Sequence, residues 1–394
     1  MQQILAIIAM NLRAIPQRAG SSLVIVIGIA GVVAVLVALL AMSQGFGATL
    51  KSTGQTDRVL FLSAGVTAEL SSVLAPEAVP VLRELPGLAR DADGRPLVSA
   101  EVVVITELQR GTGEQRADVN ASLRGVEPAG LKLRPEVQLV EGRWFTPGLR
   151  EIVVGLSASR QFEGVTVGST QQFRGSEWTV VGLFSSNGDA HESELWTDAD
   201  TARSAFGRGS SASSMLARLD TAQSIDAIKA AVKADPRLRV DAMPEIEYFA
   251  SQSKQFTEQI GLLTGVVASI MAIGALFGAL NSMYSAVSTR QVEIATLRAI
   301  GFGGFPVALS VLAEAMLLAL AGGVMGAVIA YVLFNNLSVS TLGSNFTQVA
   351  FNFAVTPALM QKGLGWALVI GLLGGLPPAI QAARQPVVEA LRGK

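Results

Sequence analysis

Residues 23–42 read LVIVIGIAGVVAVLVALLAM and contain no charged side chain. At a helical rise of about 1.5 Å per residue, a run of about 20 apolar residues crosses the hydrocarbon core of a bilayer. The run is too long for the apolar region of a cleaved signal peptide, and a long preamble precedes it. We therefore predict a permanent membrane-spanning helix here.

Three further apolar stretches have similar length, at 260–286, 305–334 and 363–380. Each is too long and too uninterrupted for the core helix of a soluble domain, so the sequence predicts four membrane spans. The composition agrees, with 50% hydrophobic and 15% charged residues, against about 25% charged residues in soluble domains.

The composition also excludes several kinds of chemistry. The chain has no cysteine and a single histidine, His191, which excludes disulfides, thiolate zinc sites and histidine-rich metal sites. A net charge of −1 gives no global field for binding nucleic acid. His191 lies in the segment DAHES, but catalytic triads are assembled from distant segments. We predict a solvated polar loop there, and no enzyme.

Basic residues near the span ends indicate the orientation, since cytoplasmic loops are enriched in lysine and arginine. They flank the first, second and fourth spans on one side: Arg13, Arg18, Arg290, Arg298, Arg384, Arg392 and Lys394. The loop on the other side, 335–362, offers only Lys362. Both termini are therefore predicted to be cytoplasmic, and the long segment 43–255 to be extracytoplasmic.

This long segment has the pattern of an α+β domain, which we expect to form two small subdomains. Short β-branched runs predict strands, a Pro-initiated stretch and an amphipathic stretch predict helices, and Asn187-Gly188 predicts a turn. The strands are expected at 58–62, 101–106, 151–154 and 178–183, and the helices at 75–84 and 224–234. Segments 43–55 and 246–258 are expected to continue the first two spans as a helical stalk.

The segment 281–301, NSMYSAVSTRQVEIATLRAIG, follows the second span. This segment is predicted to form a short amphipathic helix beneath the bilayer. Its residues recur at helical spacing, Arg290 and Glu293 are three positions apart and can pair, and Gly301 ends the helix. Such a helix suits docking into a partner's groove, but an ordinary connecting helix has the same pattern.

This segment resembles the signature of the MacB/FtsX/LolC-type permeases, the type VII ABC transporters. The signature residues are Asn281, Met283, Val287, Arg290, Glu293, Ile294, Arg298, Ala299 and Gly301. Further similar positions are Glu314, Gly322, Gly323 and Gly326, the segments 141–145 and 151–155, and the end PAIQAARQPVVEALR. Pro386 stands one position earlier than the family pattern has its proline, which predicts a displaced start for the C-terminal helix.

The resemblance implies an α-helical membrane protein with four transmembrane helices and an α+β extracytoplasmic domain, a MacB-like periplasmic core, inserted between helices 1 and 2. In this order the segments are a cytoplasmic amphipathic helix (1–20), span one (21–43), the periplasmic domain with stalks (44–257), span two (258–286), a coupling helix (287–304), span three (305–335), a short external loop (336–362), span four (363–382) and a cytoplasmic tail (383–394).

In this family the helix after span two is the coupling helix that inserts into the ATPase. The resemblance assigns this contact to Arg290, Glu293, Ile294, Leu297, Arg298, Ala299, Ile300 and Gly301, with a second contact at Leu391. The chain has no G-x-x-x-x-G-K-[ST] loop, so ATP and Mg are expected on a separate ABC ATPase, two copies per complex. The resemblance further implies an inner-membrane complex. This complex would also contain a second permease copy or a paralogue, membrane lipid and, in some systems, a periplasmic adaptor.

Glu314 lies about ten residues into span three, where it could serve coupling, form a structural hydrogen bond between helices, or be a neutral glutamic acid near the membrane interface. Three pairs with G-x-x-x-G spacing would permit close helix contacts: Gly274/Gly278, Gly322/Gly326 and Gly371/Gly375.

The function implied is export or mechanotransmission acting on a lipoprotein, lipid, peptide or drug outside the bilayer. The alternative is an FtsX-like regulator of an extracytoplasmic partner such as a cell-wall hydrolase. The length of the external segment favours the first.

Overall fold

The structure is a computed structural model that describes residues 19–110, 117–343 and 347–387. The predicted N-terminal amphipathic helix and Leu391 lie outside the described residues. The chain divides into two compact units, one of residues 1–44, 258–337 and 353–394, the other of residues 45–257 and 338–352.

Four helices in the described residues are long and apolar enough to cross a membrane. They are α2 (Ala19–Thr53), α8 (Glu245–Thr289), α10 (Gly304–Phe334) and α11 (Pro357–Arg384). Each contains one of the four predicted apolar stretches. The helical continuations expected at 43–55 and 246–258 are present, because α2 runs on to Thr53 and α8 begins at Glu245.

Two glycines of α10 bring that helix against α2. A Cβ atom at Gly322 would lie 2.8 Å from the carbonyl oxygen of Val26, and one at Gly326 would lie 3.0 Å from Cα of Ala30. Such distances leave no room for a side chain, so the backbones of the two helices meet here.

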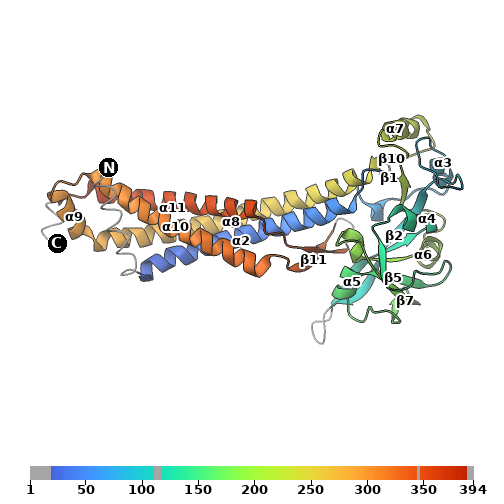
Figure 1. The fold of residues 1–394 in the computed structure, drawn as a ribbon, viewed down its shortest axis with the longest axis horizontal. Coiled ribbons are helices and arrows are strands. Elements are labelled where there is room, and N and C mark those ends of the chain that lie inside the picture. The colour runs from blue at the N-terminus through green and yellow to red at the C-terminus, as the bar shows by residue number, and fades with distance from the viewer. Residues whose placement is uncertain (1–18, 111–116, 344–346, 388–394) are drawn as a thin grey trace. The chain divides into compact units, whose positions relative to one another are not determined.

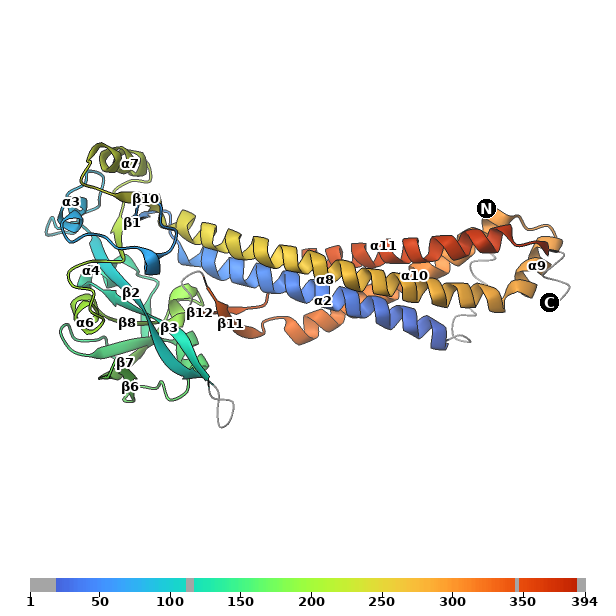
Figure 2. The ribbon, with the colours of Figure 1, turned by 180° about the vertical axis from the view of Figure 1, so that it is seen from behind.

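Two glycines of α11 bring it against α10 in the same way, and Figures 1 and 2 show these two helices side by side. A Cβ atom at Gly375 would lie 2.5 Å from Cβ of Ala315, and one at Gly371 would collide with Ala319. In contrast, a Cβ at Gly274 or Gly278 of α8 would meet no atom of the described chain within 4 Å. All three glycine pairs have G-x-x-x-G spacing. The spacing alone could not predict which pairs lie in a helix contact, since it does not indicate which face of a helix is covered.

The second unit is built on a ten-stranded sheet with the order β10-β1-β9-β2-β3-β8-β5-β7-β4, with β6 paired to β7. The strands are β1 (Arg58–Ser63), β2 (Val98–Arg110), β3 (Ala117–Val126), β4 (Gln138–Gly142), β5 (Glu151–Gly155), β6 (Thr170–Phe173), β7 (Ser176–Ser185), β8 (Glu194–Asp198), β9 (Ser214–Arg218) and β10 (Val240–Pro244). All four predicted strands lie within β1, β2, β5 and β7. The predicted turn is also found, with positive φ at Asn187 and Gly188.

Two groups of helices cover the sheet (Figure 1). Helices α3 (Ala78–Arg83) and α7 (Ser224–Ala234) pack on β1, β9 and β10 around Phe61, while α5 (Leu156–Gln161) and α6 (Ala199–Ala205) pack on β3, β5, β7 and β8 around Trp178. The predicted α7 has the expected bounds. The two subdomains that we expected thus share one continuous sheet, which β2 joins by pairing with both β9 and β3.

A β-hairpin between α10 and α11 belongs to this second unit. Its strands are β11 (Ser338–Leu342) and β12 (Gln348–Asn352). The backbone N–H of Ala350 donates to Ser193 Oγ at 2.9 Å, and the Phe351 ring packs edge-on against Phe46. The sequence predicted only a short loop at 336–362.

Candidate functional site

The helix predicted to dock a partner is α9 (Gln291–Ala299), which is shorter than the predicted segment 287–304. It begins where α8 ends, with Arg290 in a non-helical conformation between the two helices. Gly301 ends the segment with a φ of 104°, a left-handed conformation that a side chain would make costly.

The first arginine of the pattern, Arg290, faces the protein interior. Its guanidinium Nη1 donates to Oε2 of Glu314 on α10 at 3.0 Å, and both side chains are buried. The pair expected within the helix is also present, with 3.6 Å between Arg290 Nε and Oε2 of the exposed Glu293. For Glu314, the structure shows an ion pair that joins α10 to the residue between α8 and α9.

The second arginine, Arg298, reaches the end of α11. Its Nη1 donates to the backbone carbonyl of Gln385, the residue that follows that helix. Nearby, a Cβ atom at Gly304, the first residue of α10, would lie 2.7 Å from the carbonyl oxygen of Ala383. The two arginines therefore tie the two ends of α9 to α10 and α11 of the same chain.

The opposite side of α9 is exposed and partly apolar. Val292 is 58% exposed and Ile300 is 69% exposed, while Ile294 and Ala295 are buried. Thr296 and Ala299 are exposed between them. Residues three, four, seven and eight apart share one helix face, so these side chains form one stripe. We call Val292, Thr296, Ala299 and Ile300 the outer face of α9.

The predicted docking residues thus divide into two groups. Glu293, Ala299, Ile300 and Gly301 are exposed, whereas Arg290 and Ile294 are buried and Leu297 and Arg298 are half-buried. The sequence pattern did not single out Val292 and Thr296. Their spacing of eight and four residues before Ile300 was the signal that could have identified them.

A polar groove of about 450 Å³ opens beside α9, between the end of α8 and the end of α11. Its lining consists mainly of amide and hydroxyl side chains: Asn281, Tyr284, Ser285, Val287, Ser288, Gln291, Gln381 and Gln385. Such groups can hydrogen-bond a partner's backbone. In the described part of the chain, no group of three or more histidines or carboxylates could hold a metal ion.

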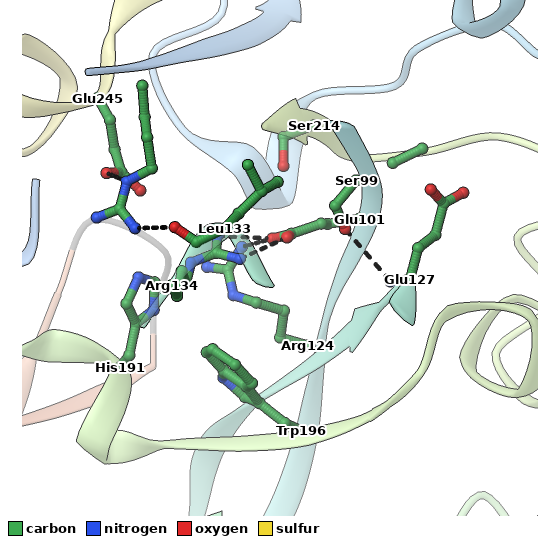
Figure 3. Close-up of polar contacts among 12 residues, drawn as sticks. Ser99, Glu101, Arg124, Glu127, Leu133, Arg134, His191, Trp196, Ser214 and Glu245 are labelled. Carbon is green, nitrogen blue, oxygen red and sulfur yellow. Dashed lines mark hydrogen bonds and ion pairs between the residues drawn. The ribbon is translucent and has the colours of Figure 1, made fainter. Parts of the chain in front are cut away.

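The second unit contains a buried ionic network that the sequence did not reveal (Figure 3). The Arg124 guanidinium, on β3, contacts the carboxylates of Glu69, Glu101 and Glu194 at 2.8 to 2.9 Å. Glu101, on β2, also accepts from Arg134 at 2.6 Å. Burial by itself would raise the pKa of Glu101, but Arg134 and Arg124 lower this pKa to about 2.

The segment around His191 is part of this interior, so our prediction of a solvated loop is wrong. His191 is 1% exposed, its Nδ1 lies 3.1 Å from Oε2 of Glu194, and its ring meets Trp196 edge-on. Asp189 caps the short helix η4 (Ala190–Ser193) by accepting from the His191 backbone N–H. Burial raises the pKa of Asp189 to about 6. The polar composition of the segment predicts exposure, but the Asp189 cap and the contact of His191 Nδ1 with Glu194 give most of these polar groups partners in the interior.

Two protein families match the chain. The MacB-like periplasmic core domain matches residues 21–235, and the FtsX-like permease C-terminal family matches residues 265–387. The first match alone covers more than half of the 394 residues.

Individual relatives agree. The chain is 26% identical over 274 residues to the macrolide export ATP-binding/permease protein MacB of Chlorobium luteolum, over 64% of this chain and 40% of that protein. It is 26% identical over 148 residues to the uncharacterized ABC transporter permease YvrN of Bacillus subtilis, over 38% of this chain and 34% of that protein. It therefore spans less than half the length of either relative. The crystal structure of the periplasmic region of MacB from Actinobacillus actinomycetemcomitans is also similar, with a TM-score of 0.37 and 14% identity, covering 53% of this chain and 94% of that one.

Proposed function

Because this chain belongs to the MacB/FtsX family of ABC transporter permeases, we propose that it couples ATP hydrolysis to movement of its α+β domain. The domain is inserted between the first two membrane spans and lies outside the cytoplasmic membrane, with both termini in the cytoplasm. Two copies of a separate ABC ATPase bind ATP and Mg and serve two permeases, either two copies of this chain or this chain and a paralogue. The cargo acted on outside the bilayer is a lipoprotein, lipid, peptide or drug.

The observation that supports this proposal is the attachment of α9 to two membrane helices at its two ends. A short helix bound at one end to α10 through Arg290 and Glu314, and at the other end to α11 through Arg298, cannot be pushed without moving those helices. A partner that presses on α9 therefore moves two membrane spans together. An ordinary connecting helix needs no such attachment at both ends.

The outer face of α9 supplies the contact with the ATPase. Exposed aliphatic side chains such as Val292 and Ile300 on a surface helix fit an apolar groove of a partner, where a few buried side chains provide most of the binding energy. In this proposal Arg290 and Arg298 hold α9 against α10 and α11, whereas the family resemblance assigned both arginines to direct contacts with the ATPase.

Copurification tests this proposal. The chain is purified in detergent from its native host, and the bound proteins are identified by mass spectrometry. We expect an ABC ATPase with the wild type, and at least a tenfold lower yield with the double variant Val292→Asp/Ile300→Asp, because loss of hot-spot contacts costs about 2 kcal/mol or more.

The matched control is Val140→Asp, which places the same charge on an exposed valine of the domain. It should leave the ATPase yield unchanged. Recovery of the ATPase with the α9 double variant at the wild-type level would contradict the proposal.

A further inference from the structure

Arg58, the first residue of β1, lies at the point where α2 ends and α8 begins. Its side chain is 1% exposed. Nε donates to Oε2 of Glu245 at 2.6 Å, Nη1 donates to the backbone carbonyl of Leu133 at 2.8 Å, and Nη2 lies 2.8 Å from Oε1 of Glu136. One guanidinium thus joins the first residue of α8 to the α4 (Pro128–Leu133) segment of the domain.

The end of α2 meets the same carboxylate. Glu245 Oε2 also accepts from the backbone N–H of Gln55 at 3.0 Å. A Cβ atom at Gly54 would lie 2.5 Å from Cα of Ile246, so the chain leaving α2 touches the start of α8. Thr53, the last residue of α2, accepts from the Ala190 N–H through its Oγ1 at 2.9 Å.

Buried contacts lead from this point to the middle of the sheet (Figure 3). Arg134, which follows Leu133 in the chain, pairs with Glu101 on β2, and Glu101 pairs with Arg124 on β3. If α8 slid against the sheet, Glu245 and Arg58 would lose each other as partners and remain as unpaired charges in the interior, which is strongly unfavourable. The network therefore resists relative movement of the helix ends and the sheet.

We propose that Arg58 is a positioning residue that fastens the ends of α2 and α8 to the sheet, so that movements of these two helices reach the whole domain. This inference rests on the proposed function and names where motion enters the domain. Arg58 touches no cargo and no nucleotide in this account. Its role is distinct from the docking of the ATPase on α9.

The experiment measures a distance inside the second unit. Because the chain has no cysteine, the exposed residues Gln255 and Asp200 can be labelled through Gln255→Cys and Asp200→Cys. Nitroxide labels on these cysteines, read by pulsed electron paramagnetic resonance, report the distance between α8 and the domain. The full chain is studied in nanodiscs with its copurified ATPase, without nucleotide and with ATP trapped by vanadate.

For the labelled chain that keeps Arg58 and Glu245, we expect one narrow distance distribution in both nucleotide states. In the Arg58→Met/Glu245→Leu variant, which removes both charges and keeps apolar volume, we expect a second population on trapping ATP. Equal ATPase yield and hydrolysis rate would show that docking on α9 is intact. If the ATPase does not bind the unsubstituted chain, that result contradicts the proposed function itself and not only the role of Arg58.

A single unchanged distribution in the folded variant would overturn the inference, and so would two populations in the unsubstituted chain. Should that variant fail to fold, Glu245→Gln keeps an acceptor for Gln55 and Arg58 without the charge, and the same two outcomes apply to it. Arg143→Met is the control, since Arg143 pairs with Glu151 at an exposed site. It should leave both distributions narrow.

Discussion

The two ends of α8 carry the same kind of contact in different surroundings. At its start, Glu245 pairs with Arg58, and just beyond its end, Arg290 pairs with Glu314. Both pairs are buried. The first lies next to the set of shared arginine and glutamate contacts around Arg124, whereas the second connects to the exposed Glu293.

This difference shows two ways of making a rigid unit. In the domain, Arg58 and Arg124 each contact several carboxylate or carbonyl groups, and Arg134 donates to both oxygens of Glu101. Removal of any one of these arginines leaves buried carboxylates with fewer partners. Among the apolar helices, close contacts at glycines such as Gly326 and Gly375 hold the elements together, and ion pairs are few in the described residues. The predictions below test whether buried ion pairs stabilise the α+β domain and whether close packing at glycines stabilises the apolar helices.

The largest effect is expected from Arg124→Met. It leaves Glu69, Glu101 and Glu194 buried with fewer partners, and breaking a buried pair by removing one side costs about 3–5 kcal/mol. Thermal unfolding of the full chain in detergent measures the loss. The control Arg143→Met breaks a pair whose arginine is 54% exposed and should cost about 1 kcal/mol or less. Equal losses for the two variants would mean that the network adds no rigidity.

Lowering the pH should destabilise the α+β domain before it destabilises the membrane helices. Because the pKa of Glu101 is about 2 in the folded domain and 4.5 in the reference state, ionisation of Glu101 favours the folded state. This stabilisation is complete above pH 4.5 and is lost as the pH falls from 4.5 towards 2. Hydrogen exchange followed at several pH values should show protection of β2 falling over this range. Protection that is constant down to pH 2 would contradict the prediction.

Filling a glycine contact should disturb the helices by an intermediate amount. Gly326→Val places a side chain where the α2 backbone lies, and overpacking costs about 1–3 kcal/mol. Gly278→Val is the control, because a Cβ atom there meets nothing within 4 Å in the described chain. A melting temperature lowered equally by both variants would show that the contact with α2 is unimportant.

The smallest effect is expected from Glu314→Gln. The amide oxygen can still accept from Arg290, so the loss is about 1–2 kcal/mol, close to that of a hydrogen bond to a charged group. Glu293→Gln, at a side chain that is 64% exposed, should change stability by about 0.5 kcal/mol or less. A loss at Glu314 as large as that for Arg124→Met would remove the contrast between the two ends.

The sequence predicted what depends on local pattern. Apolar runs identified the four long helices, and alternation or amphipathic spacing located β1, β5 and α7. The signature also drew attention to α9 before its contacts were known.

It could not predict what depends on pairing across the chain. Arg124 meets Glu69 across 55 positions and Arg58 meets Glu245 across 187, and no local pattern marks either pair. The hairpin β11–β12 was missed because its short strands are weakly alternating. The family resemblance assigned Arg298 to the ATPase contact, and the contact of Arg298 with the Gln385 carbonyl was not foreseen, because an arginine on a short polar helix gives no sign of which side it faces.

The most direct test of the account is photocrosslinking from single positions of α9. A photoreactive phenylalanine analogue replaces Val292 or Ile300 on the outer face, or Tyr331, which is exposed near the far end of α10. The account predicts crosslinks to an ABC ATPase from positions 292 and 300 and none from position 331. Absence of the ATPase from both α9 crosslinks, or equal crosslinking from position 331, would contradict it.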